Sequence, residues 1–240
     1  MGFSFRKPSN LLVLLMLLLF IFAFYIRPAL LFVFPSKAPS TSTESISELS
    51  IVLSSLLTIS FLIGIPVLWL RFVDNISLRD IPYHLKLRRS DIKLALLWGF
   101  VAFVALMLVV MFASLILKSL QPDIRNPVIE EMAGSLSLLS ILFIGVFQSS
   151  SEEVFFRGFL LDKLSIRENR NIGIVFTAIL FGFAHMAYRL AYQIILPFII
   201  GIIFGYVVTR SKNLLSSILP HVSFNLLSLV IAHYMFSLIL

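Results

Sequence analysis

Long apolar runs separated by short polar segments constrain this chain more than any other feature. A helix needs about 20 predominantly apolar residues to cross the hydrocarbon core of a bilayer. Seven stretches approach or meet that length, namely residues 10–34, 49–72, 93–117, 135–162, 171–188, 191–209 and 214–238. Hydrophobic residues make up 59% of the chain and charged residues only 13%, against about 45–50% and about 25% in soluble domains. The sequence therefore predicts an all-α polytopic transmembrane helix bundle of seven to eight spans.

The basic residues indicate how this bundle is oriented. Thirteen of the 19 Lys and Arg residues lie in segments that share one side if the N-terminus is cytoplasmic, and five lie on the other side. Cytoplasmic loops carry such an excess of positive charge, so we expect a cytoplasmic N-terminus. The net charge of +7 then reflects these loops, and nucleic acid is excluded as a partner. The chain has no cysteine, which excludes disulfides and thiolate chemistry.

The distribution of polar residues divides the chain into three segments. Residues 1–134 are expected to form N-terminal transmembrane helices joined by a basic cytoplasmic loop, residues 135–232 a core with polar motifs, and residues 233–240 the end of the last helix. The loop at 74–93 places basic residues among apolar ones, a pattern that could lie flat on the membrane surface. No internal repeat is visible, so an inverted-repeat transporter is not indicated.

Three of the late apolar runs carry polar side chains that lipid would not tolerate. These residues are Glu152, Glu153 and Arg157 on the fourth run, His185 on the fifth, and His221 and Asn225 on the seventh. A charged group at the centre of a membrane helix costs roughly 2.5–3.5 kcal/mol on insertion scales, so these groups must be paired and have a use. At about 1.5 Å per residue, the acid, imidazole and amide groups lie ~12–21 Å from the cytoplasmic ends of their helices. This similar depth favours one shared site.

The spacing within each run suggests how these groups divide their work. Glu153 and Arg157 are four residues apart with the acid first, the favourable order for a helical ion pair. Glu152 is turned about 100° from its neighbour around the helix and can face a different partner. Small side chains at residues 149–151 leave room for water beside Glu152. A carboxylate in such a partly dry site is suited to act as a general base on water.

The three motifs together resemble those of a known family. Glu-Glu-x-x-x-Arg, Phe-x-x-x-His and His-x-x-x-Asn occur in this order on separate predicted membrane helices, as in the CPBP family. That family contains CAAX prenyl endopeptidases and the bacteriocin-processing and immunity proteins of the Abi group. The resemblance covers about residues 135–231, and the flanks of the first motif match at residues 152–160. It implies an intramembrane endopeptidase whose core is the segment 135–232.

The resemblance also implies residue roles and partners. It assigns water activation to Glu152 assisted by His185, a supporting ion pair to Glu153 and Arg157, and oxyanion stabilisation to His221 and Asn225. Family members are often described as metalloproteases, and Glu152, His185 and His221 would also make a zinc set. The His-Glu-x-x-His helix of common zinc peptidases is absent from the sequence, so we expect a metal-independent mechanism without a required cofactor. The implied substrate is a lipidated or membrane-associated peptide, including prenylated CAAX peptides.

Other interpretations of the same residues remain open at this point. The charged groups could form a structural ion-pair network, and the chain could be a non-catalytic immunity or scaffold protein of the same fold. A proton-coupled transporter would also place Glu and His inside the membrane. We expect an integral, multi-pass protein of a prokaryotic plasma membrane, because the chain is short and its loops are minimal. The sequence leaves the oligomeric state and the physiological substrate open.

Overall fold

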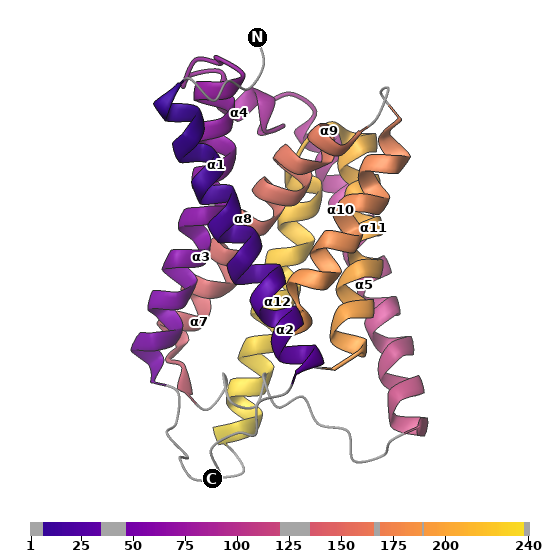
Figure 1. The fold of residues 1–240 in the computed structure, drawn as a ribbon. Coiled ribbons are helices and arrows are strands. Elements are labelled where there is room, and N and C mark those ends of the chain that lie inside the picture. The colour runs from indigo at the N-terminus through magenta and orange to yellow at the C-terminus, as the bar shows by residue number, and fades with distance from the viewer. Residues whose placement is uncertain (1–6, 35–46, 121–134, 166–168, 189, 238–240) are drawn as a thin grey trace.

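The computed structural model is an all-α bundle (Figure 1). It describes residues 7–34, 47–120, 135–165, 169–188 and 190–237, and within these ranges it contains no strand. Six of the described helical segments are long and apolar enough to cross a membrane, which confirms the predicted polytopic bundle. These segments are Pro8–Val33, Glu48–Val73, Ile92–Leu120, Leu138–Leu164, Tyr192–Ser211 and Leu215–Met235.

The first three spans are mostly α-helical and include two π-helical segments. Their elements are α1 (Pro8–Ile21), η1 (Phe22–Ile26) and α2 (Arg27–Val33), then α3 (Glu48–Leu68) and η2 (Trp69–Val73), then α5 (Ile92–Leu120). α3 begins at a side-chain cap, where the Ser47 hydroxyl accepts a hydrogen bond from the Ser50 amide. Between the second and third spans, the basic segment that could lie flat on the membrane surface contains a four-residue helix, α4 (Ile81–His84).

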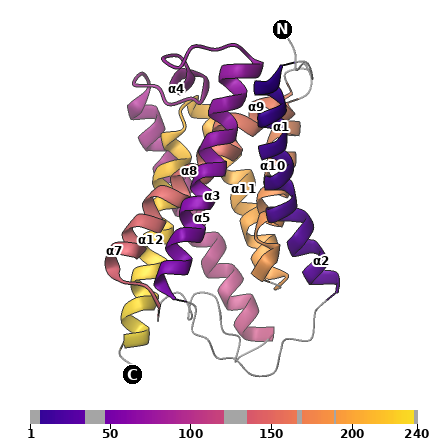
Figure 2. The same ribbon diagram turned by 60° about the vertical axis from the view of Figure 1, so that its left-hand side comes forward.

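The remaining helices carry the three polar motifs. They are α7 (Leu138–Phe143), η3 (Ile144–Gln148), α8 (Ser149–Glu153), η4 (Val154–Leu160) and α9 (Leu161–Leu164) in one continuous span, then α10 (Arg170–Ala184), η5 (Met186–Tyr188), α11 (Tyr192–Ser211) and α12 (Leu215–Ser237). α8 contacts both α3 and α12, and Figure 2 shows the span that contains it running beside these two helices. α10 packs mainly against α11, while α5 packs against α11 and α12.

The fifth expected span differs from the sequence prediction. We expected a crossing helix over residues 171–188, but α10 has only 15 residues, a length of about 22 Å at 1.5 Å per residue. Its helical hydrogen bonding ends at His185, and the 3₁₀ turn Met186–Tyr188 follows. Among the described residues, six helices therefore meet the length criterion, and α10 is a shorter apolar helix that ends just before His185.

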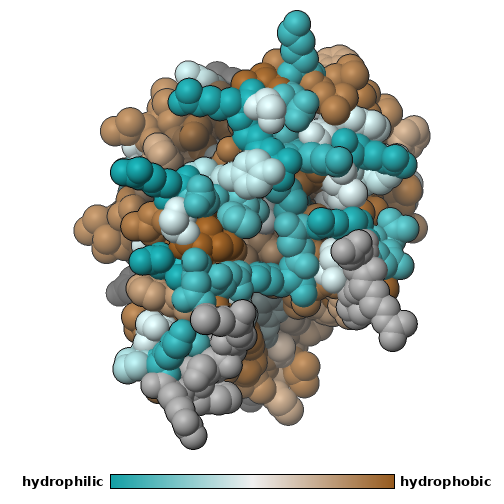
Figure 3. Space-filling view, turned by 90° about the horizontal axis from the view of Figure 1, so that it is seen from above, coloured by the Kyte–Doolittle hydropathy of each residue, from teal (hydrophilic) through white to brown (hydrophobic). Residues whose placement is uncertain are grey.

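The basic segments predicted to share one side of the membrane lie at one end of the bundle. α1 begins at the same end as α4, α9 and the connection between α11 and α12, whereas α12 ends at the opposite end (Figure 1). Figure 3 looks onto the first of these ends and shows hydrophilic side chains gathered across it, with hydrophobic side chains around them. Arg6, Lys37, Arg125, Arg167 and Arg189, which entered the orientation count, lie outside the described residues. The arrangement is that expected from the positive-inside rule.

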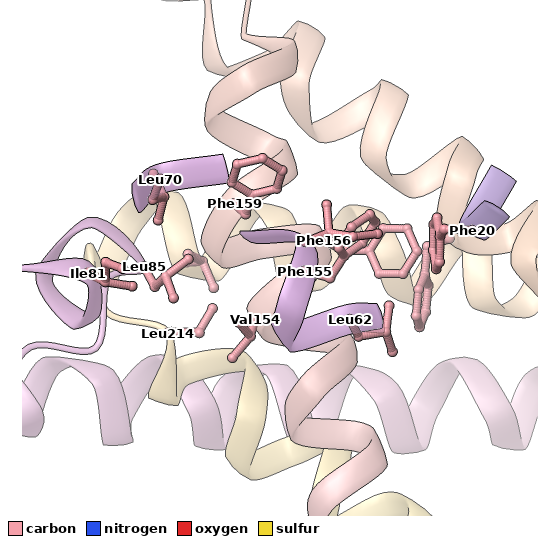
Figure 4. Close-up of a cluster of buried hydrophobic side chains, with 13 residues drawn as sticks. Phe20, Leu62, Leu70, Ile81, Leu85, Val154, Phe155, Phe156, Phe159 and Leu214 are labelled. Atoms are coloured by element: carbon pink, nitrogen blue, oxygen red, sulfur yellow. The ribbon is translucent and has the colours of Figure 1, made fainter. Parts of the chain in front are cut away.

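A cluster of buried apolar side chains holds the first motif span inside the bundle. Figure 4 shows Phe155 and Phe156 of this span beside Phe20 of α1 and Leu62 of α3. The rings of Phe20 and Phe155 lie 4.8 Å apart, centroid to centroid. Leu85, just after α4, belongs to the same cluster, so the polar end of the bundle and its interior share one core.

The close packing of α10 against α11 leads to a first prediction. A Cβ added at Gly201 of α11 would lie 2.9 Å from the Cα of Ala178 on α10, which forces the two backbones apart. We expect Gly201→Ala to lower the free energy of unfolding by about 1–3 kcal/mol, as overpacking in a close-packed interior does. Gly64→Ala is the matched control, because its Cβ would meet only the flexible end of Met16. Thermal unfolding in detergent should show a lower midpoint for Gly201→Ala alone, and equal midpoints would contradict this account.

Candidate active site

The first motif lies where the backbone of its helix departs from regular α-helical form. α8, which contains Glu152 and Glu153, is flanked by the π-helical segments Ile144–Gln148 and Val154–Leu160. π-Helical turns are rare and occur frequently at functional sites. Arg157 lies within the second π-helical segment, so the two motif acids and the motif arginine occupy the most irregular part of the span.

Glu153 and Arg157 form the ion pair that their spacing predicted. Arg157 Nη1 donates to Glu153 Oε1 over 2.9 Å, and both side chains are fully buried. The guanidinium also lies 4.2 Å above the centre of the Phe181 ring, with the Phe204 ring at 5.5 Å. Aromatic faces attract a desolvated cation. Arg157 is therefore held from one side by a carboxylate and from another by rings of α10 and α11.

Glu153 has a second partner, on another helix. His221 of α12 donates from Nδ1 to Glu153 Oε1 over 2.8 Å, because an ionised carboxylate can only accept. This bond joins the first and third motifs in one chain of contacts, Arg157 to Glu153 to His221. It also orients the imidazole, whose Nε2 is turned to Glu152 with 3.8 Å between Nε2 and Oε2. The hydrogen bond made by one ring nitrogen sets whether the other nitrogen of the neutral imidazole carries a proton.

Glu152 has a different environment from its neighbour. Its side chain is 15% exposed, whereas Glu153 is fully buried. Besides the His221 contact, its Oε1 accepts a long hydrogen bond of 3.4 Å from Gln148, one helical turn earlier. Glu152 is thus the accessible carboxylate of the pair and faces an imidazole nitrogen.

His185 lies at the C-terminal end of α10, where the helix changes to a 3₁₀ turn. Its Nδ1 is 2.8 Å from the carbonyl oxygen of Phe181, so Nδ1 carries the donated hydrogen and Nε2 is the acceptor nitrogen of the neutral ring. The Phe181 ring lies against both motif histidines, with centroid distances of 4.9 Å to His185 and 5.9 Å to His221. The Phe-x-x-x-His motif therefore brings a second imidazole to the site with its tautomer set by its own helix.

Asn225 extends the site one turn beyond His221 on α12. Its Nδ2 donates to the Ser149 hydroxyl over 2.7 Å, which connects α12 to α8 a second time. An amide nitrogen carries two hydrogens, so this bond uses one of them. Ser150 and Ser151, which we expected to leave room for water, donate to carbonyl groups of their own helix.

The structure thus gathers all six predicted side chains around the junction of α8, α10 and α12. Four of them, Arg157, Glu153, His221 and Glu152, are joined by the contacts given above. Asn225 is bonded to Ser149 of α8, and His185 lies against the Phe181 ring, which also contacts His221. Sequence reasoning did not identify Gln148 and Ser149 as partners. Their only sequence signal is polarity inside an apolar run.

The donor set does not fit a metal ion. Among the described residues, no three His, Asp or Glu side chains lie close enough to form a metal-binding group, and this includes the set Glu152, His185 and His221.

Comparison with known proteins finds a matching family model, and it covers the region of this site. Residues 134–227 match the family model described as Rce1-like, type II CAAX prenyl endopeptidase, which confirms the resemblance found in the motifs. The matched region contains all six site residues. Comparisons with curated proteins and with solved structures gave no match.

Proposed function

We propose that this chain, whose residues 134–227 match the Rce1-like family of type II CAAX prenyl endopeptidases, is an intramembrane endopeptidase that uses Glu152 to activate water. The observation that carries the proposal is the contrast between the adjacent acids. Glu153 is buried and paired, whereas Glu152 is partly exposed and faces His221 Nε2. Neighbouring carboxylates in different environments are suited to different catalytic roles.

In the proposed reaction, Glu152 removes a proton from a water molecule as the water oxygen attacks the scissile carbonyl carbon. The electron pair of the carbonyl π bond moves to its oxygen, which gives a tetrahedral oxyanion. Glu152 then returns the proton to the amide nitrogen, and the oxyanion re-forms the carbonyl group as the C–N bond breaks. The products are a carboxylic acid and an amine, and the acid proton passes to the amine to give a carboxylate and an ammonium group. Such a positioned acid–base group contributes typically 10²- to 10⁴-fold to the rate.

The other polar residues support this reaction from the three helices. Asn225 uses one amide hydrogen on Ser149, and its second hydrogen can stabilise the oxyanion. His221 donates from Nδ1 to Glu153, so it can donate to the oxyanion from Nε2 only as the imidazolium. His185 offers an acceptor nitrogen that can assist Glu152 in holding the water.

The substrate class in this proposal is a membrane-associated peptide, and a prenylated CAAX peptide is the form that we would test. The described spans expose many large apolar side chains, which is compatible with a substrate that carries a lipid group. We expect an integral membrane location, and Figure 3 is consistent with one polar face at the membrane surface.

A fluorescence assay tests the proposal. Detergent-purified protein is mixed with a quenched-fluorescent farnesylated CAAX peptide and, as a control, with the same peptide lacking the farnesyl group. We expect cleavage of the farnesylated peptide, at a rate that a strong chelator does not change. No cleavage of either peptide would overturn the CAAX assignment. Activity that is lost in chelator and restored by zinc would overturn the metal-independent mechanism.

A further inference from the structure

Lys86 lies in the basic connection between the second and third spans, outside the region that matches the family model. Its side chain nevertheless enters the polar end of the first motif span. Nζ lies 3.0 Å from the carbonyl oxygen of Arg157, 3.1 Å from that of Gly158 and 2.9 Å from the carboxylate of Asp162. A lysine ammonium has three donors, and here each donor has one acceptor.

The surroundings of Lys86 make these contacts strong. The residue is only 8% exposed, and hydrogen bonds to a charged donor are stronger than neutral ones. Burial lowers the pKa of Lys86 below the ordinary lysine value, against the opposing effect of Asp162. A carboxylate partner is what keeps such a buried ammonium favourable.

The backbone of Lys86 contacts the third motif segment. Its carbonyl oxygen accepts a 3.0 Å hydrogen bond from the amide of Leu214, the residue immediately before α12, which carries His221. Lys86 adopts a left-handed backbone conformation with φ of 60°, which is uncommon for a residue with a side chain. Asn213, which precedes Leu214 in the chain, donates from Nδ2 to the carbonyl oxygens of Arg88 and Ser90 over 2.8 and 3.2 Å. The connection is therefore attached to the start of α12 at several points.

Gly158 allows this connection to approach the first motif span closely. A Cβ at Gly158 would lie 3.2 Å from the carbonyl oxygen of Leu85 and 3.4 Å from the Leu214 side chain. The glycine of the first motif span thus has a physical reason to lack a side chain. It is in contact with the same loop that places Lys86 on the Arg157 and Gly158 carbonyls.

From these contacts we propose that Lys86 is a positioning residue of the active site. Through its side chain it holds the helix that carries Glu152 and Glu153, and through its backbone it holds the start of the helix that carries His221. It thereby sets the distance across which Glu153 and His221 form their 2.8 Å hydrogen bond. The activity part of the test rests on the proposed function, while the structural part does not.

The test compares Lys86→Met with Lys163→Met. Lys163 is the matched control, because it also pairs with an acid across the polar end of the bundle, Asp74, and is 35% exposed. The first readout is the imidazole ¹⁵N and Nδ1–H spectrum of His221 in detergent. It is assigned by its loss in His221→Gln, with His233 as the internal reference. The second readout is kcat and KM for the farnesylated peptide.

We expect Lys86→Met to shift or broaden the His221 signals while the His233 signals stay unchanged. We expect kcat to fall ~10- to 100-fold with little change in KM, because misplacing catalytic groups by about 1 Å costs up to about 100-fold. Lys163→Met should match the wild type in both readouts. An unchanged His221 spectrum in folded Lys86→Met would overturn the proposal.

A second variant keeps the proposal testable if Lys86→Met does not fold. In Gly158→Ala, the added Cβ moves the loop by only a few tenths of an ångström. This variant should shift the His221 signals in the same direction as Lys86→Met, by a smaller amount. Unchanged His221 signals would overturn the proposal. If the wild type cleaves no peptide but Lys86→Met still shifts the His221 signals, the result would support the role of Lys86 and contradict only the proposed function.

Discussion

Glu152→Gln is expected to reduce kcat for peptide cleavage by about 10²- to 10⁴-fold, the contribution typical of a positioned acid–base group. Glutamine has the same shape but cannot accept the proton of the attacking water. Because Glu152 is partly exposed and its contacts are long, 3.4 Å to Gln148 and 3.8 Å to His221 Nε2, the thermal unfolding midpoint should change little. Initial rates and unfolding midpoints of the purified variants measure both effects.

Glu48→Gln is the control for this substitution. Glu48 accepts hydrogen bonds from Ser137 at the start of the first motif span, far along that span from Glu152. We expect this variant to cleave at the wild-type rate. Equal cleavage by wild type and Glu152→Gln would contradict the assignment of Glu152 as the catalytic base.

Of the substitutions considered, Arg157→Met should lower the free energy of unfolding most, by about 3–5 kcal/mol. A loss of this size is expected when one partner of a buried ion pair is removed. Both partners are fully buried, so the substitution leaves the Glu153 carboxylate in the interior with His221 as its remaining ion-pair partner. Activity should also fall, because the position of His221 depends on Glu153. Denaturant titration in detergent measures the change in unfolding free energy.

Two comparisons separate this effect from a general loss of packing. Arg157→Met combined with Glu153→Gln should recover part of the lost stability, because no ionised carboxylate then stays buried without its arginine partner. Lys163→Met breaks a more exposed pair and should cost no more than about 1 kcal/mol. If the double variant were less stable than Arg157→Met alone, the ion-pair explanation would be wrong.

Features that lie along one helix could be predicted from the sequence. The apolar runs gave the spans to within a few residues, and the four-residue spacing of Glu153 and Arg157 predicted a pair that the structure contains. The fifth span was predicted too long because hydropathy does not register the break in hydrogen bonding at His185. The π-helical turns on either side of α8 also have no signature in the pattern of apolar residues.

Features that depend on how helices lie against one another could not be predicted. The sequence placed His221 near the depth of Glu152, but its bond to Glu153 depends on the rotation of α12 against α8. Lys86 looked like one of several basic loop residues, and nothing in its neighbourhood indicated that its side chain would contact carbonyl groups 71 and 72 residues later. Such contacts are set by tertiary packing.

Mass spectrometry of the reaction products tests the central claim most directly. Wild type and Glu152→Gln are each incubated with a farnesylated CAAX peptide, and all peptide species are identified. We expect two products from the wild type, whose masses together equal the substrate plus one water, and intact substrate from Glu152→Gln. Intact substrate from folded wild type, or the same two products from both proteins, would contradict the claim.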